Sequence, residues 1–201
     1  RTLVRDTVAR LRHTFDTGRT RDVRWRAQQL EGLRAMIDEQ GEAMYDVLAH
    51  DLGRPRLESF VAELAFLDGE IKHALKHLSA WTRPQRVSTP LALKPARAEM
   101  IPEPYGVALI LGPWNYPIQL TLGPLVGAIA AGNCVLAKPS EVTRNSSEAL
   151  ARWAPMYLDK DAVAIVEGGV EVGQAILQER FDTIFYTGGA AVAHAVMEAA
   201  A

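Results

Sequence analysis

The chain has one cysteine, Cys134, among its 201 residues. One cysteine cannot form an internal disulfide or a cysteine-based zinc site. The five histidines are scattered over predicted helices, and the pair His73 and His77 lacks adjacent acidic partners, so no metal site is expected. Cys134 begins an apolar run with no histidine near it in sequence, and we interpret it as a small buried hydrophobic residue rather than a nucleophile.

The sequence also lacks blocks of basic residues and long apolar runs. The formal net charge is -2, and no stretch of five or six consecutive Lys or Arg residues offers the basic surface that nucleic acid requires. No run of 18 apolar residues and no signal-type segment occurs. We therefore expect a soluble, cytoplasmic protein without a nucleic-acid partner, with enough apolar content to form a core.

Apolar residues recur at helical spacing through the first 81 residues. The pattern predicts amphipathic helices over 3–15, 21–50 and 58–81, the second with a possible break at Gly41 because glycine disfavours a helix interior. The side chains expected to face the core are Val4, Val8, Leu11, Phe15, Trp25, Leu30, Leu33, Ile37, Met44, Leu48, Phe60, Val61, Leu64, Leu67, Ile71, Leu75 and Leu78.

Five prolines fall between 82 and 104 and exclude an α-helix there. The short segments 86–88 and 97–101 are candidates for edge strands of an arm that leaves the globule, which would suit an oligomer contact. The alternative is a surface linker.

From residue 105 onward, predicted strands and helices alternate. Short apolar runs at 107–111, 134–137, 162–166 and 183–186 predict buried parallel strands, with helices over 117–131, 146–157, 172–180 and from 190. We expect an α/β fold in which a doubly wound, Rossmann-like parallel sheet over 105–201 carries the helices of 1–81 on its surface. Both ends of the sequence look cut, and the last helix is expected to continue past Ala201 because it has no cap.

Three polar residues follow predicted strands, where parallel sheets place their ligands. Lys138 and Glu141 have the chemistry to hold a ribose, since an ammonium donates to hydroxyls and a carboxylate accepts from a diol and repels a 2′-phosphate. A solvated loop that caps the next helix is the alternative. Asn115, between two prolines, suits an oxyanion hole, or else a turn or a helix N-cap.

The pair Gly188 and Gly189 follows the last predicted strand and opens a helix, where backbone amides can meet a phosphate. The dinucleotide fingerprint G-x-G-x-x-G is absent, with Ala193 where a further glycine would be sought. The alternative is a tight turn that needs glycine at positive φ.

Four segments together resemble the aldehyde dehydrogenase family, and within it the class 3 branch: EPYGVALILGPWNYP, GAIAAGNCVLAKPSE, VEGGV and FYTGG. The resemblance implies that Asn115 holds the oxyanion of a thiohemiacetal and that Lys138 and Glu141 contact the adenosine ribose of NAD or NADP. It also implies that 188–193 is the loop near the pyrophosphate. The family usually has G-S-T-x-x-G there, so Gly189, Ala190 and Ala193 are departures that remove two hydroxyl donors.

The resemblance further implies an enzyme that oxidises an aliphatic or aromatic aldehyde to a carboxylic acid, through a cysteine thiohemiacetal and thioester. It places the nucleophilic cysteine and the general-base glutamate beyond Ala201, so this chain alone is expected to be inactive and the full-length enzyme to be a homodimer. The alternative is a stand-alone nucleotide-binding or protein-interaction module. The uncapped end at Ala201 favours the first hypothesis.

Overall fold

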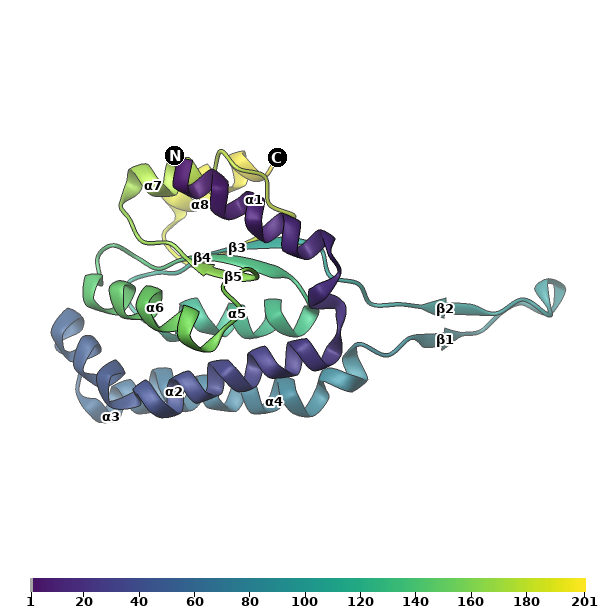
Figure 1. Ribbon diagram of the computed structural model, residues 1–201, viewed down its shortest axis with the longest axis horizontal. Coiled ribbons are helices and arrows are strands. Elements are labelled where there is room, and N and C mark those ends of the chain that lie inside the picture. The colour runs from purple at the N-terminus through teal and green to yellow at the C-terminus, as the bar shows by residue number, and fades with distance from the viewer. Residues whose placement is uncertain (1) are drawn as a thin grey trace.

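A four-stranded parallel sheet lies at the centre of the computed structural model, which describes residues 2–201 (Figure 1). The strand order is β5–β4–β3–β6, with the bounds β3 (Val107–Leu111), β4 (Cys134–Lys138), β5 (Val163–Ile165) and β6 (Thr183–Tyr186). Every residue of β3 and β4 is buried, as their unbroken apolar runs predict for central strands covered on both faces. Leu109 pairs with Leu136 on one side and with Ile184 on the other.

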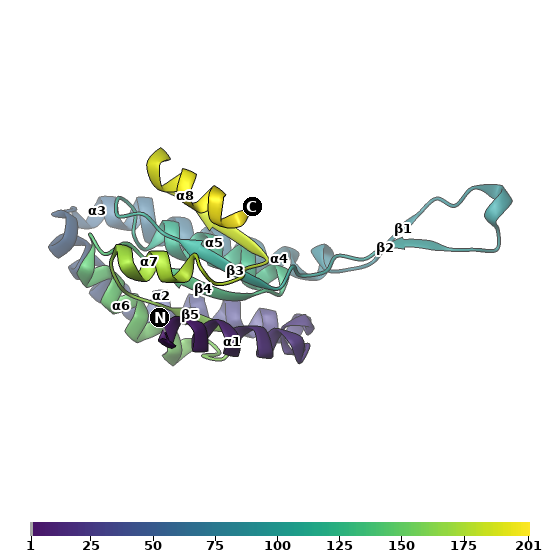
Figure 2. The ribbon, with the colours of Figure 1, turned by 90° about the horizontal axis from the view of Figure 1, so that it is seen from above.

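Helices cover both faces of the sheet. On one face lie α5 (Gln119–Ala131) and α6 (Arg144–Tyr157), and α2 (Val23–Leu52) and α4 (Ala65–Trp81) form a further layer behind them (Figure 1). On the other face lie α1 (Thr2–Asp16), α7 (Val170–Ile176) and α8 (Ala190–Ala200), with α7 between the other two when seen from above (Figure 2). The expected α/β class, a helical N-terminal segment followed by a parallel sheet, is confirmed.

The helices of the first 81 residues differ from the expectation in two respects. No break occurs at Gly41, and α2 runs on until Gly53, whose φ of 63° ends it in the left-handed conformation. The segment expected as one helix over 58–81 is α3 (Arg56–Ser59), a π-helical turn η2 (Phe60–Leu64) and then α4.

The π-helical turn corrects the predicted core. Phe60 and Val61 were expected inside but are 48% and 60% exposed, whereas Ser59, Glu63 and Leu64 are buried. A wider turn breaks the 3.6-residue repeat on which the expectation rested, so it changes which side chains face inward. The other expected core residues are buried or partly buried.

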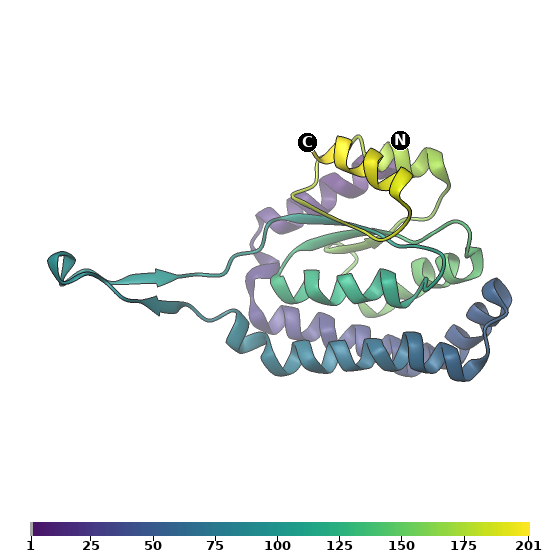
Figure 3. The same ribbon diagram turned by 180° about the vertical axis from the view of Figure 1, so that it is seen from behind.

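Smaller differences concern element ends: α5 begins two residues later than expected, α6 begins two residues earlier and α7 ends at Ile176. Between α4 and β3, β1 (Gln85–Val87) pairs antiparallel with β2 (Ala98–Met100), joined by the 3-10 turn η3 (Leu91–Leu93). This arm extends far from the globule (Figures 1 and 3), and both strands are exposed. The short turn η1 (Arg19–Arg21) joins α1 to α2. Among residues 2–201, no helix is both long and apolar enough to cross a bilayer.

Candidate functional site

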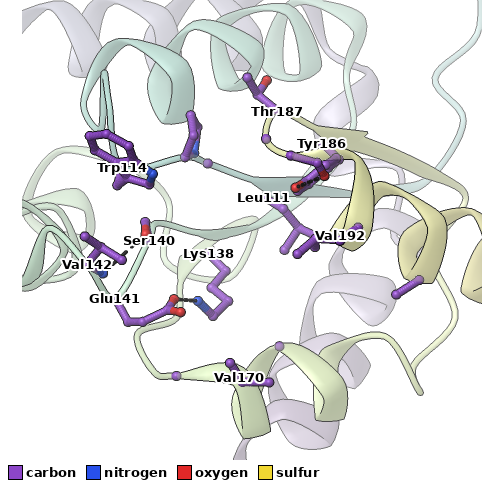
Figure 4. A pocket seen from close by; sticks show the side chains of 18 of the residues that line it. Leu111, Trp114, Lys138, Ser140, Glu141, Val142, Val170, Tyr186, Thr187 and Val192 are labelled. Carbon is purple, nitrogen blue, oxygen red and sulfur yellow. Dashed lines mark hydrogen bonds and ion pairs between the residues drawn. The ribbon is translucent and has the colours of Figure 1, made fainter.

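A cleft of about 810 Å³ opens at the carboxyl edge of the sheet (Figure 4). Its walls are the loops that follow all four strands, together with the starts of α7 and α8. The chain passes from β3 to β4 on one side of β3 and later returns to β6 on the other side. The carboxyl ends of β3 and β6 therefore form the switch point at which open α/β sheets bind ligands.

Lys138 and Glu141 form an ion pair in this cleft (Figure 4). Lys138 ends β4 and is only 7% exposed; its Nζ donates to Glu141 Oε2 over 2.9 Å and to the carbonyl oxygen of Pro139 over 3.2 Å. A lysine ammonium has three N–H donors, and these two acceptors within residues 2–201 leave one for a ligand. The side chain of Glu141 is 45% exposed, and both residues of the pair line the cleft.

The electrostatics keep Glu141 ionised. Burial alone would raise the pKa of Glu141, but hydrogen bonds from its own backbone amide and from Lys138, with the lysine charge, outweigh it and lower the pKa. The alternative of a loop that caps the next helix is wrong, although Glu141 itself is exposed to solvent. Lys138 is buried, and the first amides of α6, from Asn145 and Ser146, donate to Asp51 instead.

Asn115 lies in the exposed bend between β3 and α5 and lines the same cleft, beside Trp114. Its alternative role as the N-cap of the next helix is wrong, because the N-cap position of α5 is Ile118. The side chain of Ile118 makes no capping hydrogen bond. The backbone carbonyl of Asn115 accepts a hydrogen bond from Arg54 Nη2, and the Arg54 guanidinium lies 4.5 Å from the centre of the Tyr116 ring.

Sequence reasoning missed Glu63, which caps α5. Glu63 is fully buried, and its Oε2 accepts the backbone N–H groups of Ile118 (2.8 Å) and Gln119 (2.9 Å), while Oε1 pairs with Arg54 Nη1. Burial raises the pKa of Glu63, and these three donors act in the opposite direction. A signal was present, because Glu63 continues at helical spacing the apolar face that Leu67 and Ile71 form.

The loop between β6 and α8 contributes another wall. Gly188 and Gly189 line the cleft, whereas Ala190 and Ala193 lie in the first turn of α8 and do not. Gly189 has a φ of -73°, and neither glycine has a positive φ. The alternative of a tight turn that needs glycine at positive φ is therefore wrong. Gly188 is instead required by a close approach: a Cβ there would meet the hydroxyl and ring of Tyr186, which donates to the Gly189 carbonyl over 3.0 Å.

Cys134 lies at the start of β4 and is fully buried. Burial raises the pKa of its thiol to about 12, so a thiolate does not form there near neutral pH. The interpretation of Cys134 as a small core residue is confirmed.

Both the sequence and the structure of this chain are similar to those of known proteins. The sequence model of the aldehyde dehydrogenase family matches residues 1–201. Human aldehyde dehydrogenase family 3 member B1 is 46% identical over 196 residues, which are 98% of this chain and 42% of that protein. The substrate-bound structure of Staphylococcus aureus AldH has a TM-score of 0.96 and 36% identity, over 98% of this chain and 43% of the other.

A betaine aldehyde dehydrogenase from Staphylococcus aureus, solved in complex with NAD+, has a TM-score of 0.85 over 98% of this chain and 40% of that chain. At 20% identity this likeness shows the fold alone. The present chain spans about two fifths of the length of the curated relatives it matches. A family match over the whole chain, together with the 46% identity, leads to one conclusion: this chain belongs to the aldehyde dehydrogenase family.

Proposed function

We propose that this chain is the cofactor-binding part of an NAD(P)-dependent enzyme that oxidises an aldehyde to a carboxylic acid. The observation that carries the proposal is the convergence of Asn115, the Lys138–Glu141 pair and Gly188 on one cleft at the switch point of the sheet. Asn115 is 23 residues before Lys138 in the sequence, and Glu141 is 47 residues before Gly188. Only the fold brings these groups together.

The residues present fit a dinucleotide. Glu141 offers a carboxylate acceptor for a ribose diol, and Lys138 offers a donor to the same sugar. At the other wall, a Cβ on Gly189 would meet nothing within 4 Å, which leaves open space before the first amides of α8. Those amides have no i-4 partner in the helix and favour a pyrophosphate. A bound nicotinamide would supply the hydride acceptor for the carbon that is oxidised.

Asn115 is the oxyanion donor in this proposal. Asn115 lines the cleft, and the hydrogen bond from Arg54 to its backbone carbonyl holds the bend that carries the side chain. A preorganised donor of this kind stabilises negative charge that develops on a carbonyl oxygen. The substrate proposed from the resemblance is an aliphatic or aromatic aldehyde.

The nucleophile has to come from outside residues 2–201. The one cysteine, Cys134, is buried in β4 with a pKa of about 12 and does not line the cleft. The present residues therefore bind and orient, while a thiolate and a general base from the remainder of a longer protein perform the acyl chemistry. A homodimer and a cytoplasmic location stay predictions.

The test compares the full-length protein with the 201-residue chain. Formation of reduced nicotinamide is measured by absorbance with an aldehyde and either NAD+ or NADP+. We expect turnover by the full-length protein and none by the chain alone. Cofactor binding without any aldehyde-dependent reduction by the full-length protein would support the nucleotide-binding module instead. Activity of the chain alone, abolished by Cys134→Ser, would contradict the account of Cys134.

A further inference from the structure

The loop that carries Asn115 is fastened by a charged pair from a distant part of the sequence. Arg54 follows the C-cap of α2, and Glu63 lies in the π-helical turn η2, 52 residues before Asn115. Arg54 is 9% exposed and Glu63 is fully buried. A buried ion pair has a large desolvation cost and contributes little net stability, so its presence beside a site calls for an explanation.

The contacts of the pair converge on one short segment. Glu63 Oε2 accepts the amides of Ile118 and Gln119, which are the free N–H groups at the start of α5. Arg54 donates from Nη1 to Glu63 and from Nη2 to the carbonyl of Asn115, and its planar face covers Tyr116. Its third nitrogen, Nε, lies 3.3 Å from Oε1 of Glu58, one turn further along the chain. Four residues of the segment 115–119 thus contact these two side chains.

The chemistry of the two side chains suits this task. A guanidinium presents several donors in a rigid plane, so it can hold a carboxylate and a carbonyl at once, whereas a lysine ammonium is a single point of attachment. The negative charge of Glu63 also faces the positive end of the α5 dipole. The π-helical turn is what places Glu63, rather than Phe60, on the inner side.

We infer that Arg54 and Glu63 are positioning residues that set the place of Asn115 in the cleft. Neither lines the cleft, so they act through the backbone of 115–119 and not by touching a ligand. This inference rests on the proposed function only for its effect on turnover; the fastening of the loop is a separate, measurable property.

The chain offers a matched control. Arg56 pairs with Glu42 and lies 4.3 Å from the centre of the Tyr45 ring, so it repeats the ion pair and the aromatic contact of Arg54. Both partners of that pair are exposed, at 61% and 77%, and none of the three residues lines the cleft. Arg54→Met and Arg56→Met therefore remove similar side-chain interactions, only one of which reaches Asn115.

The first measurement is amide hydrogen exchange of the full-length protein without ligand. In Arg54→Met we expect exchange of the 114–119 segment to accelerate by about 10-fold or more. The carbonyl of Asn115 loses its donor, and Glu63, which accepts the amides of Ile118 and Gln119, loses its buried cationic partner. Arg56→Met should leave that segment unchanged. Equal exchange in both variants and in the wild type would overturn the inference. If Arg54→Met does not fold, Arg54→Lys replaces it, because lysine keeps the charge but lacks the planar guanidinium. We then expect a smaller acceleration of exchange in the same segment.

The second measurement is a double-mutant cycle on turnover. We expect Arg54→Met to lower kcat/KM by about 10-fold to 100-fold, because a displacement of about 1 Å is enough for such a loss, with the dissociation constant for NAD+ unchanged. In an Asn115→Ala background, Arg54→Met should lower kcat/KM by less than about twofold. The effects of two substitutions do not add when one residue acts through the other. Full multiplication of the two losses would show that Arg54 does not act through Asn115. If Asn115→Ala alone leaves kcat/KM intact, the oxyanion role fails, while the exchange data still decide whether the pair fastens the loop.

Discussion

On the side of the cleft that β3 and β4 form, the candidate groups are polar side chains. Lys138 is held by Glu141 and Pro139, and the bend of Asn115 is held by Arg54. On the side that β6 and α8 form, the candidate groups are backbone amides and glycines, and Tyr186 makes the one side-chain hydrogen bond found there within residues 2–201.

This difference has a physical consequence. A charged side chain with a buried partner discriminates between ligands, because charge and geometry have to match. Backbone amides at a helix start donate to the oxygens of any phosphate and tolerate a wide range of side chains nearby. We therefore expect substitutions on the β3–β4 side to change turnover and cofactor choice, and substitutions on the β6–α8 side to change local stability and overall cofactor affinity.

The largest effect is expected for Asn115→Ala in the full-length enzyme. Losing one preorganised oxyanion donor should lower kcat/KM by roughly 100-fold, about 3 kcal/mol. Steady-state kinetics and cofactor titration check the result, and the dissociation constant for NAD+ should change little. Asn145→Ala is the control. It removes a side-chain amide that donates to Asp51 and does not line the cleft, so kcat/KM should stay nearly unchanged. Loss of cofactor affinity with turnover retained at saturation would show that Asn115 is a structural residue.

The next effect separates the two glycines of the β6–α8 side. Gly188→Ala should lower the free energy of unfolding by about 1–3 kcal/mol, because the new methyl group displaces Tyr186 from its bond to Gly189. Gly189→Ala meets open space and has an ordinary φ, so it should change stability little. Denaturant unfolding of both variants checks this contrast. Equal losses would mean that the close approach of Tyr186 does not explain Gly188.

A smaller effect is expected for cofactor choice on the β3–β4 side. A 2′-phosphate brings about -1.5 to -2 charges toward Glu141, so we expect a moderate preference for NAD over NADP. Glu141→Gln should narrow that preference by roughly threefold to tenfold, because Glu141 is half exposed and its charge is partly screened. Lys138→Ala should weaken NADP more than NAD. Dissociation constants of both cofactors are measured at one ionic strength, and equal shifts for the two would show that neither residue faces the 2′ position.

The parts of this molecule that the sequence predicted are those with a local signal. Apolar runs predicted β3 and β4 because a strand buried on both faces needs no polar residue. Lys138, Glu141 and Asn115 were selected because they follow strands, and parallel strands bring their carboxyl ends to one edge. Their convergence on one cleft agrees with that reasoning.

The Arg54–Glu63 pair could not be predicted in the same way. Its contacts join residues 55 and 61 positions apart, and helical periodicity treats each helix without its neighbours. The π-helical turn also changes the repeat within the segment, so the expectation for Phe60 and Val61 followed a spacing that the backbone does not keep. A carboxylate at an apolar-face position was the remaining clue, and its partner becomes visible only in the fold.

The smallest expected effect restores a side chain to the β6–α8 side. Gly189 has an extended backbone that serine adopts without strain, and a Cβ there meets nothing within 4 Å. A serine hydroxyl at this N-cap position would lie at the start of α8, so it adds one donor to the wall where pyrophosphate is proposed to bind. At this exposed position we expect one added hydrogen bond to contribute about 1 kcal/mol net, which corresponds to roughly fivefold tighter binding of NAD+. Because serine also stabilises a helix N-terminus, Gly189→Ala is the matched control for the added Cβ, and thermal unfolding of both variants separates stability from affinity. Tighter binding by the serine variant alone would support a phosphate at this wall. Unchanged binding in both variants would show that the cofactor does not reach Gly189.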